Sequence, residues 1–234
     1  MGISGKKALV FGGTSGIGLA TTKRLAAAGA KVIAISRSPA KAGDLPAGVE
    51  TRQCDVLDVD ALQALFKAEG SHDILISAAT GGARAAGPFM EMDLAAYQGS
   101  FAKLWGYTNV VRYGAPTLAD SGSIVLVSGT PARRGKPGQI AIASVGGAVE
   151  AFAREVAAEL APKRVNVVSP GVIDTPMFGP DSPDRAERVK GMTAQNLIPR
   201  GGKPDEVAQA IILCVENDFM TGSVIQVDGG WLVS

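Results

Sequence analysis

The residues from Leu9 to Leu19 constrain the fold of this chain most, because an apolar run there leads into a glycine-rich turn and then a helical pattern. Gly12, Gly16 and Gly18 let the backbone turn sharply and approach a phosphate group that a Cβ atom would keep away. A helix that begins at this turn directs unpaired N–H groups and the positive end of its dipole to the same point. The spacing is G-x-x-x-G-x-G rather than the commoner G-x-G-x-x-G. The stretch therefore predicts a pyrophosphate-binding turn.

Short apolar runs alternate with helical patterns along the whole chain. The apolar runs are continuous, as in strands that helices cover on both faces, and they predict strands at Lys7–Phe11, Lys31–Ser36, Val49–Cys54, Asp73–Ser77, Ser123–Ser128, Arg164–Ser169 and Ser223–Val227. The helical patterns predict helices at Ile17–Ala28, Val59–Ala68, Asp93–Leu118, Gly138–Leu160 and Pro204–Val215. This alternation is typical of an α/β fold with a doubly wound parallel sheet. No boundary or repeat divides residues 1–234, so we expect a single domain.

Composition and charge exclude several classes of protein. The formal net charge is +1 and charged residues make up 19% of the chain, which gives no electrostatic reason for binding nucleic acid or a membrane. No apolar run is long enough to span a bilayer and no signal peptide precedes the first strand, so a soluble cytoplasmic protein is expected. Cys54 and Cys214 lie in apolar segments, where we expect reduced core thiols. One histidine and two distant cysteines cannot form a metal site or a nucleophilic triad.

An insert at about residues 175–200 interrupts the alternation. Three prolines precede residue 184, and a polar helical pattern follows at Arg185–Gln195. The insert comes after the carboxyl end of a predicted strand, which is where ligands bind in sheets of this kind. We interpret it as a lid over the site; the alternative is a long surface connection.

Four motifs, in this order, resemble those of the short-chain dehydrogenase/reductase family. Residues 11–18, F-G-G-T-S-G-I-G, stand where the family has T-G-x-x-x-G-x-G. Asp55-Val56 resembles the pair after the third strand, whose aspartate meets adenine, and residues 170–175, P-G-V-I-D-T, are similar to the P-G-x-I-x-T that anchors the nicotinamide carboxamide. Residues 220–230 resemble the last strand. The resemblance covers the whole chain and implies a Rossmann-like sheet of about seven strands with helices on both faces.

The resemblance also implies which residues bind the cofactor: Gly12, Thr14, Ser15, Gly16, Ile17, Gly18, Ser36, Arg37, Ser38, Asp55, Val56, Ala78, Ala79, Pro170, Gly171, Ile173 and Thr175. At the end of the second strand, an acid would bind a ribose 2′-hydroxyl, whereas an arginine accommodates a 2′-phosphate. This chain has Ser36-Arg37-Ser38 there and no acid. A guanidinium can bind phosphate in a bidentate manner, so we predict that NADP(H) is preferred over NAD(H). The alternative is that Arg37 is a solvated surface residue.

The catalytic tetrad of the family is missing. In the family an Asn, a Ser and a Tyr-x-x-x-Lys pair form a proton relay, and the aligned positions here hold Lys103, Gly129, Ile142 and Gly146. No nearby register restores the pair, because residues 139–149 contain neither Tyr nor Lys. The N-N-A-G motif after the fourth strand is altered as well and reads S-A-A-T at residues 77–80. The usual proton relay is therefore absent.

Three side chains are candidates for a replacement catalytic group. Lys103 would point into the space that the missing Tyr and Lys leave, where desolvation lowers the pKa of an ammonium group; the alternative is a solvated helix lysine. Ser128 would bond a substrate oxygen; the alternative is a strand-end serine that bonds the backbone. Tyr107, one turn beyond Lys103, would share its helix face and is a third conceivable replacement; the alternative, which we prefer, is a packing residue. The only histidine, His72, lies at the amino end of the fourth strand and is assigned no role.

A basic loop follows the fifth strand at the expected mouth of the cleft. Arg133, Arg134 and Lys136 would recognise an anionic small-molecule substrate, and the alternative is a solvated basic loop.

Two functions remain open at this point. The first is an NADP(H)-dependent oxidoreductase with a non-standard active site that reduces a carbonyl, imine or enone group. The second is an NADP(H)-binding pseudoenzyme with a sensing, scaffolding or non-redox role. The apolar faces at Asp93–Leu118 and Gly138–Leu160 and the last strand resemble the family's oligomer interfaces, so a homo-oligomer is expected, a tetramer or a dimer.

Overall fold

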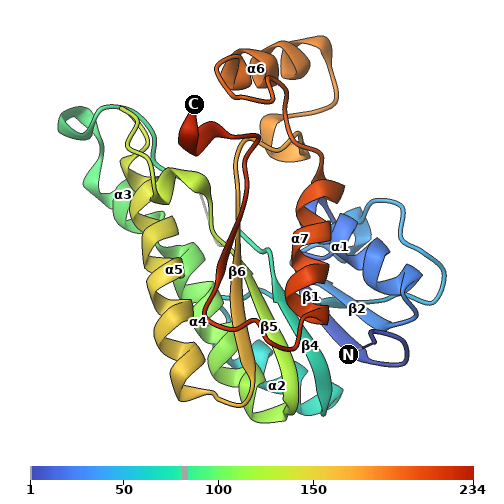
Figure 1. The fold of residues 1–234 in the computed structure, drawn as a ribbon. Helices are drawn as coiled ribbons and strands as arrows, with labels where there is room; N and C mark the ends of the chain where they lie inside the picture. The colour runs from blue at the N-terminus through green and yellow to red at the C-terminus, as the bar shows by residue number, and fades with distance from the viewer. Residues whose placement is uncertain (1, 81–83) are drawn as a thin grey trace.

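The computed structural model describes residues 2–80 and 84–234, and its centre is a parallel sheet (Figure 1). Its strands are β1 (Lys7–Phe11), β2 (Lys31–Ser36), β3 (Glu50–Gln53), β4 (His72–Ser77), β5 (Leu118–Val127), β6 (Arg164–Pro170) and β7 (Val224–Val227). They lie in the order β3-β2-β1-β4-β5-β6-β7, and all neighbouring pairs are parallel. The strand order reverses between β1 and β4, so the crevice at their carboxyl ends is the expected ligand site. The predicted doubly wound α/β fold is confirmed.

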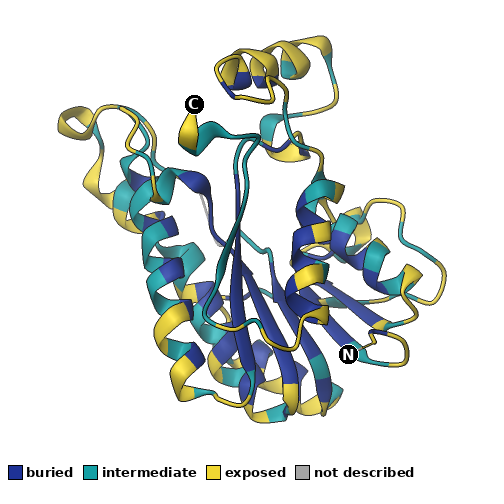
Figure 2. Cartoon of the chain, in the orientation of Figure 1, coloured by how far each residue is buried: buried dark blue, intermediate teal, exposed yellow. Residues whose placement is uncertain are grey.

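Helices cover both faces of this sheet, which explains why its strands are apolar throughout. Helices α1 (Gly16–Ala27) and α7 (Pro204–Glu216) pack on one face, and α2 (Val59–Glu69), α4 (Ala102–Gly114) and α5 (Ile140–Glu159) pack on the other. Along β1, Leu9 and Phe11 point into the core under α2, α4 and α5, whereas Ala8 and Val10 point into the core under α1 and α7. Figure 2 shows the strands as a buried layer and the helices exposed on their outer sides.

The predicted single helix at Asp93–Leu118 is wrong. The segment forms α3 (Leu94–Gly99), α4 and a 3₁₀ turn, η3 (Ala115–Thr117), and Leu118 already begins β5. The break falls at Ser100, whose hydroxyl donates to the carbonyl of Ala96 at 2.9 Å and accepts the N–H of Ala85 at 2.9 Å. A serine that bonds the preceding turn in this way competes with the regular helix ladder. Pro116 has no N–H and helps to end the second helix.

The insert at residues 175–200 forms a 3₁₀ turn, η5 (Pro176–Phe178), and a helix, α6 (Pro183–Thr193). Figure 1 shows α6 beyond the carboxyl edge of the sheet, on the same side of the molecule as the C-terminus. The helix is tied to the segment after β6, because Arg185 Nε donates to Asp174 Oδ1 at 2.7 Å. The helix thus has an anchored start, and its role as a lid stays an expectation.

Within residues 2–80 and 84–234, none of the helices combines the length and the apolar character needed to cross a bilayer.

Candidate active site

The glycine-rich turn joins β1 to α1, and at Gly12 and Gly18 the chain packs too closely for a side chain. Gly12 has φ +78°, and a Cβ atom there would lie 2.8 Å from the backbone nitrogen of Ala79. A Cβ atom on Gly18 would collide with the carbonyl oxygen of Gly12. Ser15 is the N-cap residue of α1, and its side chain makes no capping hydrogen bond. The turn therefore presents bare backbone and a helix N-terminus to one point, as a pyrophosphate requires.

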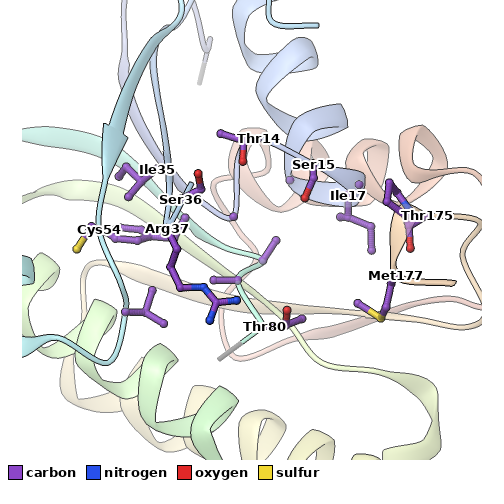
Figure 3. Close-up of a pocket in the computed structure, with 18 of the residues that line it drawn as sticks. Thr14, Ser15, Ile17, Ile35, Ser36, Arg37, Cys54, Thr80, Thr175 and Met177 are labelled. Carbon is purple, nitrogen blue, oxygen red and sulfur yellow. The ribbon is translucent and has the colours of Figure 1, made fainter. Parts of the chain in front are cut away.

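This turn forms one wall of a cavity of ≈ 220 Å³ at the carboxyl ends of β1 and β2 (Figure 3). The cavity unites most of the predicted cofactor residues: Gly12, Thr14, Ser15, Gly16, Ile17, Gly18, Ser36, Arg37, Asp55, Val56, Ala78, Ala79 and Thr175. Ser38 lies outside it, at the start of the 3₁₀ turn η1 (Pro39–Lys41). Six residues not predicted as cofactor-binding also line it: Phe11, Ile35, Cys54, Thr80, Pro176 and Met177.

Two side chains at the end of β2 have polar atoms available for a ligand. The buried Ser36 Oγ has no hydrogen-bond partner among the described residues. Arg37 is exposed, extends into the cavity and makes no ion pair with a described residue. One carboxylate oxygen of Asp55, Oδ1, accepts a hydrogen bond from the N–H of Leu57 at 3.0 Å. These groups fit the adenosine half of a dinucleotide with an additional phosphate on its ribose.

A second cavity, of ≈ 250 Å³, adjoins the first and shares Ile17, Ala78, Thr80, Thr175 and Met177 with it. It extends over the carboxyl ends of β5 and β6 and is lined by three further predicted cofactor residues, Pro170, Gly171 and Ile173. Its outer wall comes from the insert and the C-terminal segment through Met177, Phe178, Met192 and Trp231. Residues of the expected lid thus line the cavity that a nicotinamide and a substrate would share.

The four tetrad positions lie in the walls of the second cavity and of a small side cavity beside it. Lys103, Gly129 and Ile142 line the second cavity, and Lys103, Ile142 and Gly146 line the side cavity, which has a volume of ≈ 20 Å³. A Cβ atom on Gly146 would lie 3.1 Å from the Cβ of Ala132 and 3.3 Å from the Gly129 carbonyl oxygen. A side chain at the helix position that carries Lys in the family would therefore require its neighbours to shift by a few tenths of an ångström.

Lys103 extends from α4 into the same region. Its Nζ donates to the carbonyl oxygen of Ser128 at 3.1 Å and lies 5.5 Å from the ring centroid of Tyr107. Both partners are uncharged. Burial, with a smaller contribution from the positive charge of Arg84, lowers the pKa of Lys103 to about 7. The side chain is therefore poised to give up or take up a proton near neutral pH.

Ser128 has a different partner from either one expected from the sequence. Its Oγ donates to Oε1 of the buried Glu150 at 3.0 Å, and Arg133 Nε donates to the other carboxylate oxygen at 2.8 Å. The Ser128 hydroxyl proton is thus committed to a carboxylate. Arg133 is likewise engaged, and Arg134 packs on the C-terminal segment, bonding the Trp231 carbonyl and lying 5.0 Å from the Trp231 ring centroid. Of the basic loop, only Lys136 lines the second cavity.

Tyr107 and His72 are interior residues. Tyr107 is 1% exposed and its hydroxyl donates to the Val127 carbonyl at 3.1 Å, so it packs inside the chain. Burial raises the pKa of this phenol well above its ordinary value. His72 is buried at the amino end of β4 and stacks on Phe66 at 5.8 Å, and burial lowers its pKa.

Sequence reasoning missed Arg84 and the buried Glu150. Arg84 lies in the segment after β4, lines both the second cavity and the side cavity, and contacts Met177 Sδ through Nη1 at 3.4 Å. Its place just after the carboxyl end of a central strand was the available signal. Glu150 lies mid-helix in α5, and nothing in its sequence neighbourhood indicates that it is buried. Among the described residues, no group of three or more His, Cys, Asp or Glu side chains could hold a metal ion.

Fold and site together define a doubly wound α/β protein with an elongated cleft for a dinucleotide at its switch point. The chain belongs to the short-chain dehydrogenase/reductase family of oxidoreductases. Residues 12–232 match the family described as enoyl-(acyl carrier protein) reductase. The predicted family and the Rossmann-like fold are thereby confirmed.

Individual relatives match over nearly their full length. L-xylulose reductase of Bos taurus is 32% identical over 243 residues, which cover 99% of this chain and 98% of the relative. A 3-oxoacyl-[acyl-carrier-protein] reductase of Thermotoga maritima is 34% identical over 253 residues, with full coverage of both chains. Among solved structures, a small-chain dehydrogenase in complex with NADPH is 28% identical with a TM-score of 0.83, covering 99% of this chain and all of the other. A short chain dehydrogenase/reductase family protein is 33% identical with a TM-score of 0.87 over both whole chains.

Proposed function

We propose that this protein is an NADP(H)-dependent oxidoreductase that reduces a carbonyl, imine or enone group and uses Lys103 as its proton donor. The observation that carries the proposal is the position of the Lys103 ammonium group. It lies beside the Ile142 and Gly146 positions, where the family has its Tyr and Lys, and its pKa is about 7. The ideal pKa of a general acid is close to the working pH.

The cofactor half of the proposal rests on the cleft. The glycine-rich turn would hold the pyrophosphate, Asp55 the adenine, and Ser36 with Arg37 the 2′-phosphate. Pro170, Gly171, Ile173 and Thr175 would hold the nicotinamide in the second cavity. A structural relative with the same fold has been solved with NADPH bound, which supports this placement.

The residues of this chain would then complete the reduction. When bound, the dihydronicotinamide supplies a hydride to the electrophilic carbon of the substrate. Lys103 would donate its proton to the oxygen or nitrogen that gains the electron pair and would then be reprotonated from solvent through the cavity mouth. The Ser128 carbonyl orients the amine at 3.1 Å. Met177, Phe178 and Met192 line the outer side and would limit the access of water there.

Loss of the family's tetrad does not by itself end catalysis. A general acid contributes roughly 10²–10⁴-fold in rate. Positioning of two reactants corresponds to effective molarities of about 10⁵–10⁸ M. The larger contribution is the positioning of the two reactants, and a cleft that still binds both of them would retain it. The experiment that tests the proposal is a screen of carbonyl, imine and enone compounds with NADPH. Turnover is measured as the decrease in NADPH absorbance.

A second function, an NADP(H)-binding pseudoenzyme, is favoured by a specific observation. Gly129, Ile142 and Gly146 replace every hydroxyl and amine that the family places there. Tight NADPH binding without turnover across the whole screen would favour this second function.

We expect NADPH to bind more tightly than NADH. The Arg37→Ala variant should show a smaller difference between the two affinities. The guanidinium faces the cavity without a carboxylate partner among the described residues, so its removal affects only the ligand that carries a 2′-phosphate. Loss of one charge-assisted contact is expected to weaken NADPH binding by roughly tenfold. Calorimetric titration with both nucleotides measures the two dissociation constants. The control is Lys67→Met on α2, which removes a distant exposed charge. Equal affinities in the unmutated protein would contradict the prediction.

We also propose that the protein is a homo-oligomer, a tetramer of dyad symmetry. Trp105 on α4 is 62% exposed, and the neighbouring α5 adds the partly buried Phe152 and Val156 to the same outer layer. Light scattering should return four times the chain mass of 23.9 kDa, and Trp105→Glu should lower the measured mass. A value of 23.9 kDa for the unmutated protein would refute the oligomer.

A further inference from the structure

The second cavity is lined by basic side chains that have no acidic counterpart in the described part of its walls. Arg84, Lys103 and Lys136 line it, and no Asp or Glu is among its described lining residues. The loops that carry Arg84 and Lys136 are joined by a hydrogen bond from the Gly87 N–H to the Gly138 carbonyl at 3.1 Å. The cations therefore come from two connected loops and one helix around a single space.

None of these three cations has an acidic partner within residues 2–80 and 84–234. Arg84 contacts the Met177 sulfur, and Lys103 bonds a backbone carbonyl. Lys136 has no side-chain partner in that part of the chain. The adjacent Arg133, by contrast, is neutralised by Glu150. The described residues therefore supply no carboxylate to neutralise Arg84, Lys103 and Lys136.

This arrangement costs free energy unless a ligand offsets it. Arg84 and Lys103 line the same ≈ 20 Å³ side cavity, and the charge of Arg84 helps to lower the pKa of Lys103. Like charges held together in a partly desolvated site repel each other. The phosphates of a bound dinucleotide would lie at the glycine-rich turn, of which only Ile17 lines the second cavity, so the counter-charge here would come from another anion.

The other lining residues of the second cavity indicate the size and polarity of the ligand body. Apolar side chains dominate it: Ile142, Val172, Met177, Phe178, Met192 and Trp231. The space of ≈ 250 Å³ must also accept the nicotinamide, so the ligand is small.

We propose that the substrate is a small carboxylic acid with an apolar body, whose carboxylate pairs with Arg84 while its reducible group faces Lys103. A guanidinium binds a carboxylate in a bidentate manner, which fixes the orientation of the acid as well as its charge. Lys136 adds attraction at the entrance. The inference rests on the proposed oxidoreductase function for the reducible group, but the anion site itself stands on the charges alone.

The test compares phenylacetate with the neutral phenylacetamide, each titrated by calorimetry into NADPH-loaded protein. The acid is expected to bind on the order of tenfold more tightly than the amide, because only the acid forms the charge-assisted pair. Arg84→Met should remove this preference, whereas Arg84→Lys should retain part of it and Lys67→Met all of it. Thermal unfolding of each variant checks that the fold is intact.

Three results would overturn the anion site: equal binding of acid and amide, an unchanged preference in Arg84→Met, or no binding of either probe at millimolar concentration. Turnover of neutral carbonyl compounds with no preference for their carboxylate analogues would also count against the site, but would leave the proposed reduction in place. Acid-selective binding without turnover of any keto acid would support the site and contradict the proposed reduction.

Discussion

Lys103→Met is expected to lower turnover on the order of 10²–10³-fold, as the loss of one group that stabilises a developing oxyanion does. Methionine fills a similar volume, so the cavity keeps its shape while the proton donor is lost. NADPH affinity should stay nearly unchanged, since Lys103 lines the second cavity and not the one formed by the glycine-rich turn. The thermal unfolding midpoint should change little, because the variant removes a desolvated charge together with that charge's hydrogen bond to the Ser128 carbonyl. Steady-state kinetics with any substrate found in the screen measure the effect.

A pH profile separates proton donation from simple charge stabilisation. The pKa of Lys103 is about 7, so the protonated donor is present below that pH and is lost as the pH rises through it. For the unmutated protein, kcat/KM for the reduction should therefore fall above about pH 7. Lys103→Arg keeps the positive charge but cannot release a proton in this range, and its residual activity should be low and independent of pH. Activity that survives Lys103→Met would move the proton source to bound water or Ser128.

Most of the predicted cofactor residues line one cavity, and the sequence could indicate this because the glycine-rich turn depends on backbone shape. Gly12 and Gly18 are at positions where any side chain would strike the chain itself, and such requirements leave a glycine pattern that can be read directly. The end of β2 and the segment 170–175 are fixed in the same way by strand ends that a parallel sheet brings to one edge. Of the predicted cofactor residues, only Ser38, which follows Arg37 directly, lines neither of the two cavities.

The catalytic half depends on side chains from distant segments, and for that reason the sequence predicts it poorly. Ser128 bonds Glu150, which lies 22 residues away on α5, and this contact has no local signal. Arg84 enters the cavity from a connection with no regular periodicity. The break at Ser100 sets the start of α4, which carries Lys103, and the Ser100 hydroxyl there bonds both the preceding turn and the distant N–H of Ala85. These contacts form only after the chain has folded.

Gly18→Ala is expected to lower NADPH affinity by on the order of 10²-fold, as a displacement of about 1 Å in a positioned site does. The added Cβ atom would occupy the place of the Gly12 carbonyl oxygen, so the turn and the start of α1 must move apart. Those are the two elements that would hold the pyrophosphate. Cavity walls farther away, including Lys103 and Arg84, should keep their positions.

The matched control is Gly191→Ala, the same change in the exposed helix α6, where nothing lies within 4 Å of the new atom. There the higher helix propensity of alanine should stabilise the fold by about 0.5–1 kcal/mol and leave nucleotide binding unchanged. Fluorescence titration with NADPH and thermal unfolding of both variants measure the contrast. A Gly18→Ala protein that is folded and binds NADPH as tightly as the unmutated chain would show that this turn does not hold the phosphates, because a backbone collision at Gly12 cannot be relieved without reshaping the turn.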